Sequence, residues 1–373
     1  MNILYVGSPE LFSEGASSLH VARMCEAFAE LGHDVELVIP IDEEKQTDFF
    51  EYYNIQHRFK LNPTKGIAKG SSRHLFHGVF SFFKVLGKNY DFVVTRNITF
   101  AFLISFFKSN IIVDIHHPPV NYLSRVAIKR FIQSSNVIKI SCNSEGTKKN
   151  IEDNFSSSKK LKVLHNGVNL GLFKSNKNPA LFKKAFNIPE GPKVVSYVGN
   201  TYKGRGIEKI VELSKIHKNL FFLIVGGENE DNRVYQDHLL LDQENVLFTG
   251  HVRNIDIPNF LAISDVLLIP YNSDFTIKGG SVASEYSSPI KLFEYLSAGK
   301  PIIASNLPSI SRILSDEVNC ILVEPDSFDL LNKSLIRVIE DKVLSEKISI
   351  NSLNLSKEFT WMNRARNMID MDI

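Results

Sequence analysis

A short run in the last third of the chain, SSPIKLFEYLSAGKPIIAS, combines a helix start, a lysine and a glutamate in an order that suits phosphate binding. Ser288 is a favourable N-cap, and Pro289, which lacks an N–H donor, suits the first helical position. Gly299 suits the left-handed residue that ends a helix. The spacing predicts a helix from Pro289 to about Ala298, followed by a buried strand over residues 301–304.

Lys291 stands in the first turn of this predicted helix, where the positive end of the helix dipole disfavours a cation. A bound phosphate would remove the conflict, because Lys291 and the backbone N–H groups around Ile290 would share it. Glu294, one turn deeper, is placed to accept hydrogen bonds from a ribose. The alternative is an ordinary solvated pair of charges, although Lys before Glu is the less favourable order on a helix.

A second candidate phosphate site is the loop GNTYKGRG, residues 199–206. It follows an apolar strand over 194–198 and precedes a helix with inward apolar residues. Lys203 and Arg205 lie inside this glycine-bounded loop, so it is a plausible cradle for a diphosphate.

Basic side chains also follow two predicted strands in the first half of the chain. Arg96 comes after the strand 92–95, and His116 and His117 come after the strand 111–115. Because ligands bind at the carboxyl ends of strands in open α/β sheets, these residues are candidate ligand contacts. Adjacent histidines are also compatible with a metal, but no cysteine or third histidine stands at ligand spacing, and the sequence predicts no metal site.

Strand-like and helix-like segments alternate through both halves of the chain, which predicts an α/β fold built from parallel βαβ units. The first half starts with a strand over Asn2–Val6, a loop to Gly15, a helix from Ser17 or Ser18 to Leu31, and a second strand. The dinucleotide fingerprint GxGxxG is absent from that loop, which argues against a dehydrogenase. A length of 373 residues suits two domains, each with its own core.

Composition excludes several classes of protein. A formal charge of +2 argues against a dedicated nucleic-acid binder. Cys25, Cys142 and Cys320 are far apart and lie among apolar residues, as expected for free thiols in a reducing compartment. The chain starts directly with a strand, and no apolar run is long enough to span a bilayer. We therefore expect a cytoplasmic protein whose membrane contact, if any, is peripheral.

The stretch between Tyr52 and Tyr90 has no acidic residue. Its seven basic residues are Arg58, Lys60, Lys65, Lys69, Arg73, Lys84 and Lys88. It is also rich in apolar residues, namely Phe76, Val79, Phe80, Phe82, Phe83 and Leu86. This combination predicts contact with an anionic membrane through residues 58–88, at the inner face of the membrane. The alternative is that the phenylalanines are core residues and the lysines a solvated face.

Several of these motifs are similar to those of glycosyltransferase family 4, the retaining sugar-nucleotide enzymes of the GT-B fold. SPIKLFEYLSAGKPIIAS resembles the family form SPxKLFEYmAaGKPivaS almost residue by residue. GASSLHVARMCEAFAELGHDVELV resembles its acceptor-side motif, DIHHPP its E-x-H-d-P segment, and HNGVNLGLF its exit from the first domain. The resemblance spans nearly the whole chain and is weakest over residues 41–90.

The resemblance implies two Rossmann-like domains facing across a cleft. Residues 1–172 would bind the acceptor, and residues 173–355 would bind the nucleotide sugar. Residues 356–373 would form a C-terminal helix that crosses back to the first domain. The polar stretch 175–192, which contains two prolines, is the predicted linker region.

The resemblance also implies roles for individual residues. It places Gly15 at the donor sugar and phosphate, and it gives His116 a hydrogen bond to the sugar or the leaving group. Arg205 takes the place of a lysine that contacts the diphosphate. The main chain at His251 and Val252 would read the nucleobase.

The sequence departs from the family pattern at two positions. Asn200 stands where the family has an arginine, which shifts phosphate binding toward Lys203. Tyr286, with Glu285 beside it, stands where the family often has a first glutamate, so backbone groups of the loop 279–286 would contact the sugar. His20 occupies a recurrent family histidine, and the alternative is a buried histidine that packs the helix.

Together these features predict a metal-free, retaining glycosyltransferase that moves a sugar from a nucleoside diphosphate to an acceptor hydroxyl. UDP is favoured over GDP, and the expected acceptor is a lipid-linked or polysaccharide-precursor glycan. No carboxylate pair stands out for a double displacement, so catalysis would rest on positioning and on stabilising the departing diphosphate. The alternatives are a non-catalytic sugar-nucleotide-binding partner subunit and a sugar-nucleotide epimerase of the same fold.

Overall fold

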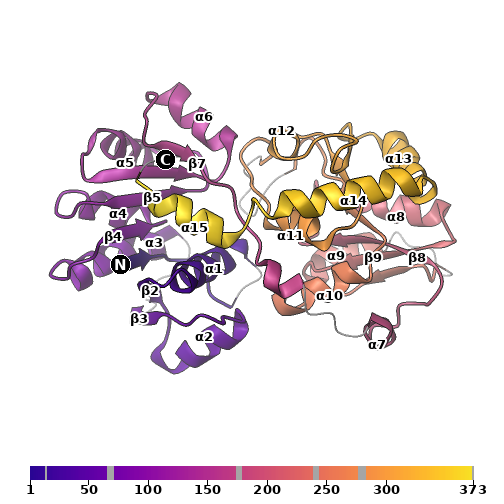
Figure 1. The fold of residues 1–373 in the computed structure, drawn as a ribbon, viewed down its shortest axis with the longest axis horizontal. Coiled ribbons are helices and arrows are strands. Elements are labelled where there is room, and N and C mark those ends of the chain that lie inside the picture. The colour runs from indigo at the N-terminus through magenta and orange to yellow at the C-terminus, as the bar shows by residue number, and fades with distance from the viewer. Residues whose placement is uncertain (13–14, 65–70, 174–178, 238–242, 276–282, 372–373) are drawn as a thin grey trace. The chain divides into compact units, whose positions relative to one another are not determined.

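The structure is a computed structural model that describes residues 1–373 except 13–14, 65–70, 174–178, 238–242, 276–282 and 372–373. The chain forms two compact units (Figure 1). Unit 1 comprises Met1–Gly167 and Trp361–Ile373, and unit 2 comprises Val168–Thr360. The expected divisions are at 172 and 356. Val168, the first residue of unit 2, donates from its backbone N to Phe359 O (2.9 Å) in the same unit.

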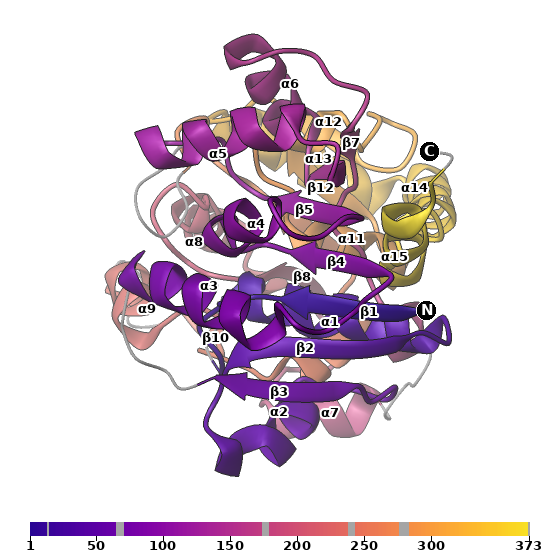
Figure 2. The ribbon, with the colours of Figure 1, turned by 90° about the vertical axis from the view of Figure 1, so that its left-hand side faces the viewer.

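Unit 1 contains a parallel sheet in the order β3-β2-β1-β4-β5-β6-β7, of which Figure 2 shows β3 to β5 from bottom to top. The chain adds β2 and β3 on one side of β1 and the later strands on the other, so the order reverses between β1 and β4. Val6 pairs with Thr95, and Thr95 pairs with Val113, which aligns the carboxyl ends of three neighbouring strands. The strands are β1 Asn2–Val6, β2 Asp34–Pro40, β3 Lys60–Thr64, β4 Phe92–Thr95, β5 Ile111–Ile115, β6 Val137–Cys142 and β7 Leu161–Val163.

The helices of unit 1 are α1 Ala16–Glu30, α2 Gln46–Tyr52, α3 Ser71–Val85, α4 Ile98–Ile104, α5 Tyr122–Gln133, α6 Glu145–Asn154 and α15 Trp361–Ile369. Apolar residues of α3, α4, α5 and α6 form one core with the sheet, whereas α1 packs against α15. Gly78 allows α3 to approach α4, since a Cβ there would lie 2.6 Å from Asn97 Oδ1.

Unit 2 repeats the same plan with a parallel sheet in the order β10-β9-β8-β11-β12-β13, whose order reverses between β8 and β11. Its strands are β8 Lys193–Val198, β9 Leu220–Val225, β10 Val246–Phe248, β11 Val266–Ile269, β12 Ile302–Ser305 and β13 Ile321–Val323. Its helices are α7 Pro179–Ala185, α8 Ile207–Ile216, α9 Asn229–Gln236, α10 Ile257–Ala262, α11 Ile290–Ala298, α12 Pro308–Ser311, α13 Phe328–Glu340 and α14 Lys342–Ser356.

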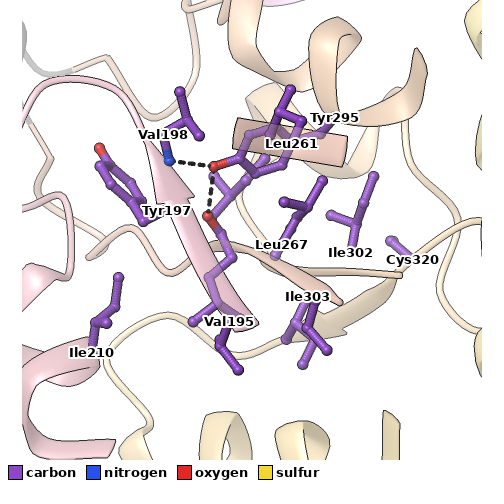
Figure 3. Packing of buried hydrophobic residues seen from close by; sticks show 14 of the residues in the cluster. Val195, Tyr197, Val198, Ile210, Leu261, Leu267, Tyr295, Ile302, Ile303 and Cys320 are labelled. Atoms are coloured by element: carbon purple, nitrogen blue, oxygen red, sulfur yellow. Dashed lines mark hydrogen bonds between the residues drawn. The ribbon is translucent and has the colours of Figure 1, made fainter. Parts of the chain in front are cut away.

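Tyr295 of α11 bridges the two strands at which the order reverses. Pairing of β8 with β11 is recorded at Val266 and Leu267, opposite Val195 and Ser196. Beyond that point the Tyr295 hydroxyl accepts a hydrogen bond from Val198 N (2.7 Å) and donates one to Leu268 O (3.3 Å), as Figure 3 shows. The strands can therefore separate at their carboxyl ends without leaving these two backbone groups unpaired.

Several sequence expectations require correction. Residues 41–64 contain α2 and β3, which the pattern did not reveal, and β3 accepts Pro63 because it is an edge strand. The predicted linker contains α7, since Phe182 packs against Phe260 with ring centroids 4.8 Å apart. The predicted C-terminal helix is α15, separated from α14 by residues 357–360. No helix in the described ranges has the length and apolar composition needed to cross a bilayer.

Candidate functional site

The carboxyl edge of the unit 2 sheet carries two cations at the point where the strand order reverses. Lys291, on the first turn of α11, donates from Nζ to the Tyr197 hydroxyl (2.8 Å) and lies 4.0 Å from the centre of that ring. The Tyr197 hydroxyl donates onward to Asn200 O (2.6 Å). Arg205 lies over two rings, with Cζ 4.7 Å from the centre of Tyr271 and 4.9 Å from that of Phe275.

Tyr271 brings the two cations together, because Lys291 Nζ also lies 5.2 Å from the centre of its ring. Aromatic faces attract cations but carry no net charge. In the described part of the chain, neither Arg205 nor Lys291 has a carboxylate within 4.0 Å. The Nε atom of Arg205 is also buried without a hydrogen-bond partner among the described residues. The site therefore holds positive charge that an anionic ligand would neutralise.

Glycines in the loop after β8 make room for these cations. A Cβ on Gly199 would lie 2.2 Å from Lys291 Nζ, and Gly199 has φ +138°. A Cβ on Gly206 would lie 1.9 Å from Pro270 O, so the loop before α8 is pressed against the end of β11. Only glycine fits both the space and the backbone conformation at these two positions.

The electrostatics of the site also favour an anion. Burial lowers the pKa of Lys291 to about 8, an effect strengthened by the charge of Arg205 and opposed by Tyr271 and Glu294. The Lys291 ammonium is therefore costly in the unliganded protein. A phosphate beside it would stabilise the charged form.

The loop after β10 lies next to α11. Asn254 Nδ2 donates to Glu294 Oε1 (3.4 Å), which links this loop to the predicted ribose-binding glutamate. Gly226 N donates to Gly250 O (3.0 Å), so the loops after β9 and β10 also meet. His251 is exposed, and Val252 packs partly into the core. The structure thus brings Lys291, Glu294 and the predicted base-binding loop to one helix.

One sequence expectation at this edge is contradicted, and two others stay predictions. Helix α11 starts at Ile290 with Pro289 as its N-cap, so the prediction of Ser288 as N-cap is wrong. The fixed φ of proline suits both a helix start and extended backbone, and its ψ of 125° places Pro289 outside the helix. Lys203 is exposed on the loop. Of the predicted sugar-binding loop, residues 279–282 lie outside the described residues.

Unit 1 has a second polar centre around Asp114, which sequence reasoning did not single out. Asp114 Oδ2 lies 3.0 Å from both His20 Nε2 and His116 Nε2. Asp114 Oδ1 accepts from Ser141 Oγ (2.8 Å) and Arg364 Nη2 (2.7 Å). Asp114 is buried in β5, so protein groups rather than water are its hydrogen-bond partners.

These contacts fix the protonation of both histidines. Burial alone would raise the pKa of Asp114, but Arg364 and the histidines hold it well below its usual range. Burial lowers the pKa of His20 to about 4, and burial together with Arg96 holds that of His116 well below normal. An ionised carboxylate only accepts, so the neutral His116 ring must donate through Nε2–H. The lone pair of His116 at Nδ1 is therefore the group left to accept from a ligand. His20 also places Nδ1 2.9 Å from Asn166 Oδ1, and a neutral ring can donate to only one of Asp114 and Asn166.

The same three residues meet the distance criterion for a metal site. One ligand atom from each of His20, Asp114 and His116 lies within 4.8 Å of the others. The fold supplies the third histidine that sequence spacing did not show, since His20 is 94 positions from Asp114. The hydrogen bonds and the neighbouring Arg364 account for this cluster without an ion. The expectation of no metal remains a prediction.

The remaining expected contact in unit 1 is Gly15, which is the N-cap of α1 with extended backbone. The predicted cap at Ser17 or Ser18 is therefore wrong, because Ser18 is buried and donates to Gly15 O (3.0 Å). Arg96 Nη1 donates to Ser17 O (3.2 Å), so the arginine after β4 lies beside this loop. His20 is buried, as the packing interpretation expects, but it also contacts Asp114.

Comparison with known proteins agrees with this geometry. The family model "Glycosyltransferase Family 4" matches residues 17–172, and the model "Glycosyl transferases group 1" matches residues 179–354. The Bacillus subtilis protein TuaH, named as a teichuronic acid biosynthesis glycosyltransferase, is 27% identical over 281 residues, 73% of this chain and 66% of its own length. An Escherichia coli UDP-Gal:alpha-D-GlcNAc-diphosphoundecaprenol alpha-1,3-galactosyltransferase is 29% identical over 196 residues, 50% of this chain and 47% of its own.

Solved structures of the same fold match the whole chain. Anabaena HepE in complex with UDP and glucose has a TM-score of 0.73 at 16% identity and covers 98% of this chain and 97% of its own. UDP-GlcNAc 2-epimerase from Neisseria meningitidis has a TM-score of 0.64 at 16% identity, with 100% and 99% covered. The fold is thus shared by enzymes of different activity. The chain spans about half to two thirds of the length of the curated relatives it matches.

Two family models that together span most of the chain, and motifs that the structure brings to the carboxyl edges of two Rossmann-like sheets, lead to one conclusion. The chain belongs to glycosyltransferase family 4.

Proposed function

We propose that this protein is a retaining glycosyltransferase that transfers a sugar from a nucleoside diphosphate to an acceptor hydroxyl. The observation that carries the proposal is a pair of cations, Arg205 and Lys291, which both lie beside the ring of Tyr271. Neither has a carboxylate partner in the described residues. Breaking the glycosidic bond of the donor leaves negative charge on the diphosphate. Preorganised cations at that position lower the barrier without reorganisation during the reaction.

The proposed role of His116 follows from its tautomer. Because Nε2–H is committed to Asp114, a neutral His116 offers only the Nδ1 lone pair to a ligand. It would accept a hydrogen bond from a sugar hydroxyl and thereby orient the donor. The described residues bring one buried carboxylate to this centre, Asp114, and its two oxygens are already bonded, which does not favour it as a nucleophile.

UDP is the proposed nucleotide. Support comes from the relative whose name gives UDP-Gal as its donor and from the fold neighbour HepE, which was solved with UDP and glucose. A thermal-shift panel of UDP, GDP, ADP and NAD tests this proposal, because a ligand that binds only the folded state raises Tm. We expect stabilisation by UDP alone and loss of the shift in Glu294→Ala. Stabilisation by NAD alone would overturn the proposal.

The transfer is proposed to need no metal. Arg205 and Lys291 supply the positive charge that a divalent cation supplies in other diphosphate sites. Turnover measured with and without a chelator tests this directly. Loss of turnover on chelation, restored by Mg²⁺ or Mn²⁺, would contradict the proposal.

The proposed acceptor is a lipid-linked or polysaccharide-precursor glycan at an anionic membrane surface. The outward face of α3 and the turn after α4 form an apolar patch whose side chains are between 47% (Phe76) and 71% (Phe83) exposed. We call it the α3 patch, and its members are Leu75, Phe76, Phe80, Phe83, Phe106 and Phe107. Phe82 connects its two parts, with ring centroids 5.2 Å from Phe83 and 5.3 Å from Phe107. The core alternative therefore holds for Phe82 but not for Phe76, Phe80 and Phe83.

Charge complementarity favours a lipid surface over a second protein on the α3 patch. Apart from Asp91, the sequence has no acidic residue from 52 to 113. Some of its cations are engaged within the protein, since Lys88 and Lys60 reach Glu36 at 2.8 and 3.6 Å. The apolar side chains must therefore contribute much of the binding.

Flotation with vesicles tests the membrane proposal. We expect the protein to float with vesicles that contain phosphatidylglycerol and to bind less to pure phosphatidylcholine. The double variant Phe80→Glu/Phe83→Glu should abolish vesicle binding. Phe82 is not substituted, because it is a buried core residue. Equal binding of the wild type and the double variant at low salt would reject it, and a shift from dimer to monomer in the double variant would instead identify a second copy as the occupant.

Two alternatives remain for experiment. A non-catalytic partner subunit would bind UDP tightly without donor hydrolysis or transfer. An epimerase, an activity found on this fold in the Neisseria meningitidis enzyme, would convert a UDP-sugar without any acceptor. Incubation of the protein with UDP-sugars, with and without membrane extract, distinguishes transfer, epimerisation and binding alone.

A further inference from the structure

The Asp114 centre is completed by a segment far away in the sequence. Arg364 of α15 is 250 positions from Asp114 and pairs with it at 2.7 Å, with side chains 1% and 0% exposed. We propose that Arg364 is a positioning residue that fixes the Asp114 carboxylate so that His116 presents its Nδ1 lone pair to the donor sugar. This inference rests on the proposed function for its catalytic consequence, but the arrangement itself is testable without turnover.

The guanidinium is held by several groups besides Asp114. Arg364 Nη1 donates to His165 O (2.9 Å), and Nη2 is also 3.3 Å from Ser141 Oγ. Ser141 in turn donates to the same Asp114 oxygen as Arg364 (2.8 Å). A rotation of the carboxylate would break its bonds to Arg364 and Ser141 on one oxygen and to the two histidines on the other. Arg364 holds Asp114 Oδ1, and this leaves Oδ2 in the position that orients His116.

Helix α15 is itself fixed near both ends. Trp361 lies edge-to-face with His20 at 5.2 Å between ring centroids. At the other end, the buried Lys139 of β6 donates to the carbonyls of Asn367 (2.7 Å) and Asp370 (2.6 Å). A lysine at the C-terminal carbonyls of a helix is favourable for both the hydrogen bonds and the dipole. Arg364 is thus supported by contacts that do not involve Asp114.

The charges around His116 explain why an arginine is needed. His116 faces His20 of α1, Arg96 after β4 and Asp114 of β5, and among these groups only Asp114 is anionic. Without Arg364, burial would favour a neutral, protonated Asp114. A protonated Asp114 would no longer be an acceptor only, and His116 would lose its single orientation.

Matched substitutions separate this role from simple attachment of α15. Arg364→Met removes the charge and keeps much of the volume. Lys139→Met loosens the end of α15 but touches neither Asp114 nor His116. Arg366→Met, on the same helix, changes an exposed arginine that contacts Asn363. Arg364→Gln keeps an N–H donor without the charge and serves if Arg364→Met does not fold.

Steady-state kinetics with the UDP-sugar that the wild type turns over gives the first result. We expect kcat to fall about 100-fold in Arg364→Met, as for a misplacement of about 1 Å, with a smaller change in the donor KM. The acid limb of its pH profile should move to higher pH, because the pKa of Asp114 rises without Arg364. Lys139→Met and Arg366→Met should keep the wild-type kcat, and Arg364→Lys should recover part of it. A Lys139→Met enzyme as slow as Arg364→Met would overturn the inference.

The histidine tautomers give a result that does not depend on activity. ¹⁵N NMR of histidine-labelled protein, with His116 assigned by His116→Gln, should show a neutral Nε2–H ring in the wild type and a mixture of forms in Arg364→Met. An unchanged His116 signal in Arg364→Met or Arg364→Gln would reject the positioning role. If no UDP-sugar is turned over while this signal changes, the proposed function fails and the role of Arg364 in orienting His116 stands.

Discussion

The two sheet edges treat buried charge in opposite ways. At the edge of unit 2, Arg205 and Lys291 lie on aromatic rings, and no described carboxylate lies within 4.0 Å of either. At the edge of unit 1, Asp114 and Arg364 form a closed pair at 2.7 Å, and the histidines complete it. Charge that is left unpaired is available to a ligand, whereas charge that is paired within the protein fixes geometry. This difference supports the proposal that unit 2 binds the diphosphate and unit 1 orients the sugar.

The largest expected effect concerns the closed pair. Asp114→Asn leaves Arg364 buried without its counterion, so we expect the free energy of unfolding to fall by about 3–5 kcal/mol. Urea titration measures it. The double variant Asp114→Asn/Arg364→Met, which removes both charges, should recover much of that stability. If Asp114→Asn is as stable as the wild type, Arg364 does not depend on Asp114 as its counterion, and the contrast between the two sheet edges is wrong.

Arg205 and Lys291 should behave differently, because the proposed function gives them a ligand as their partner. Arg205→Ala and Lys291→Ala should each reduce turnover by roughly tenfold to a thousandfold. They should also reduce the UDP-induced rise in Tm while leaving the stability of the unliganded protein nearly unchanged. Wild-type turnover in both variants would remove the proposed stabilisation of the leaving group.

Gly199 tests whether the space around Lys291 matters. A Cβ in Gly199→Ala would overlap Nζ and would also stand on a backbone with φ +138°. Strain of this kind costs about 1–3 kcal/mol, and displacement of Lys291 should weaken UDP binding at the same time. Gly32→Ala, also at positive φ but with no heavy atom within 4 Å of the new Cβ, is the matched control for strain alone. Equal UDP affinity in the two variants would show that the space beside Lys291 is not used.

The pH dependence of UDP binding follows from the lowered pKa of Lys291. In the free protein this amine loses its proton as the pH rises through about 8, whereas a bound diphosphate raises its pKa. Binding should therefore take up a proton above pH 8, and Kd should rise by up to about tenfold per pH unit there. Calorimetry in buffers of different ionisation enthalpy measures this uptake. Lys291→Arg, which stays charged, should show a flatter profile, and a flat wild-type profile would contradict the assignment.

The smallest effect is expected at Lys203. Its side chain is exposed, in contrast to the neighbouring Arg205. Lys203→Ala should change UDP affinity by about twofold or less, the range of surface substitutions. A loss as large as that of Arg205→Ala would support the sequence-based expectation that Lys203 compensates for Asn200.

The sequence predicted the parts of this molecule that depend on local patterns. The strands β4 and β5 lie at their predicted bounds, and Gly299 ends α11 in the left-handed conformation as expected. Arg205 and Lys291 were singled out because glycine loops and helix starts have local signatures, and their role in phosphate binding stays a prediction. The α/β fold with two Rossmann-like units, and membership of the family, are confirmed.

The remaining features depend on contacts between distant residues. An aspartate in the otherwise apolar strand IIVDI was a signal for a buried polar centre, but nothing local connects it with Arg364 or His20. The aromatic support of Lys291 by Tyr197 and Tyr271 is similarly distributed over three elements. The α2–β3 region was missed because its strand contains a proline and lies at the sheet edge.

The chain enters unit 2 at Val168 and leaves it after Thr360, and these two residues form a parallel β-bridge. This arrangement has a consequence for the order in which the two units are synthesised. Unit 2 is continuous in sequence, so a ribosome can deliver all of it before Trp361 emerges. Most of unit 1 is synthesised before unit 2, but its last segment, from Trp361, is synthesised after unit 2. Arg364 can therefore contact Asp114 only after unit 2 has been translated. Domains usually fold as they are made. Until Arg364 has been added, the nascent unit 1 lacks this partner for Asp114, and unit 2 is the first unit whose residues are all present.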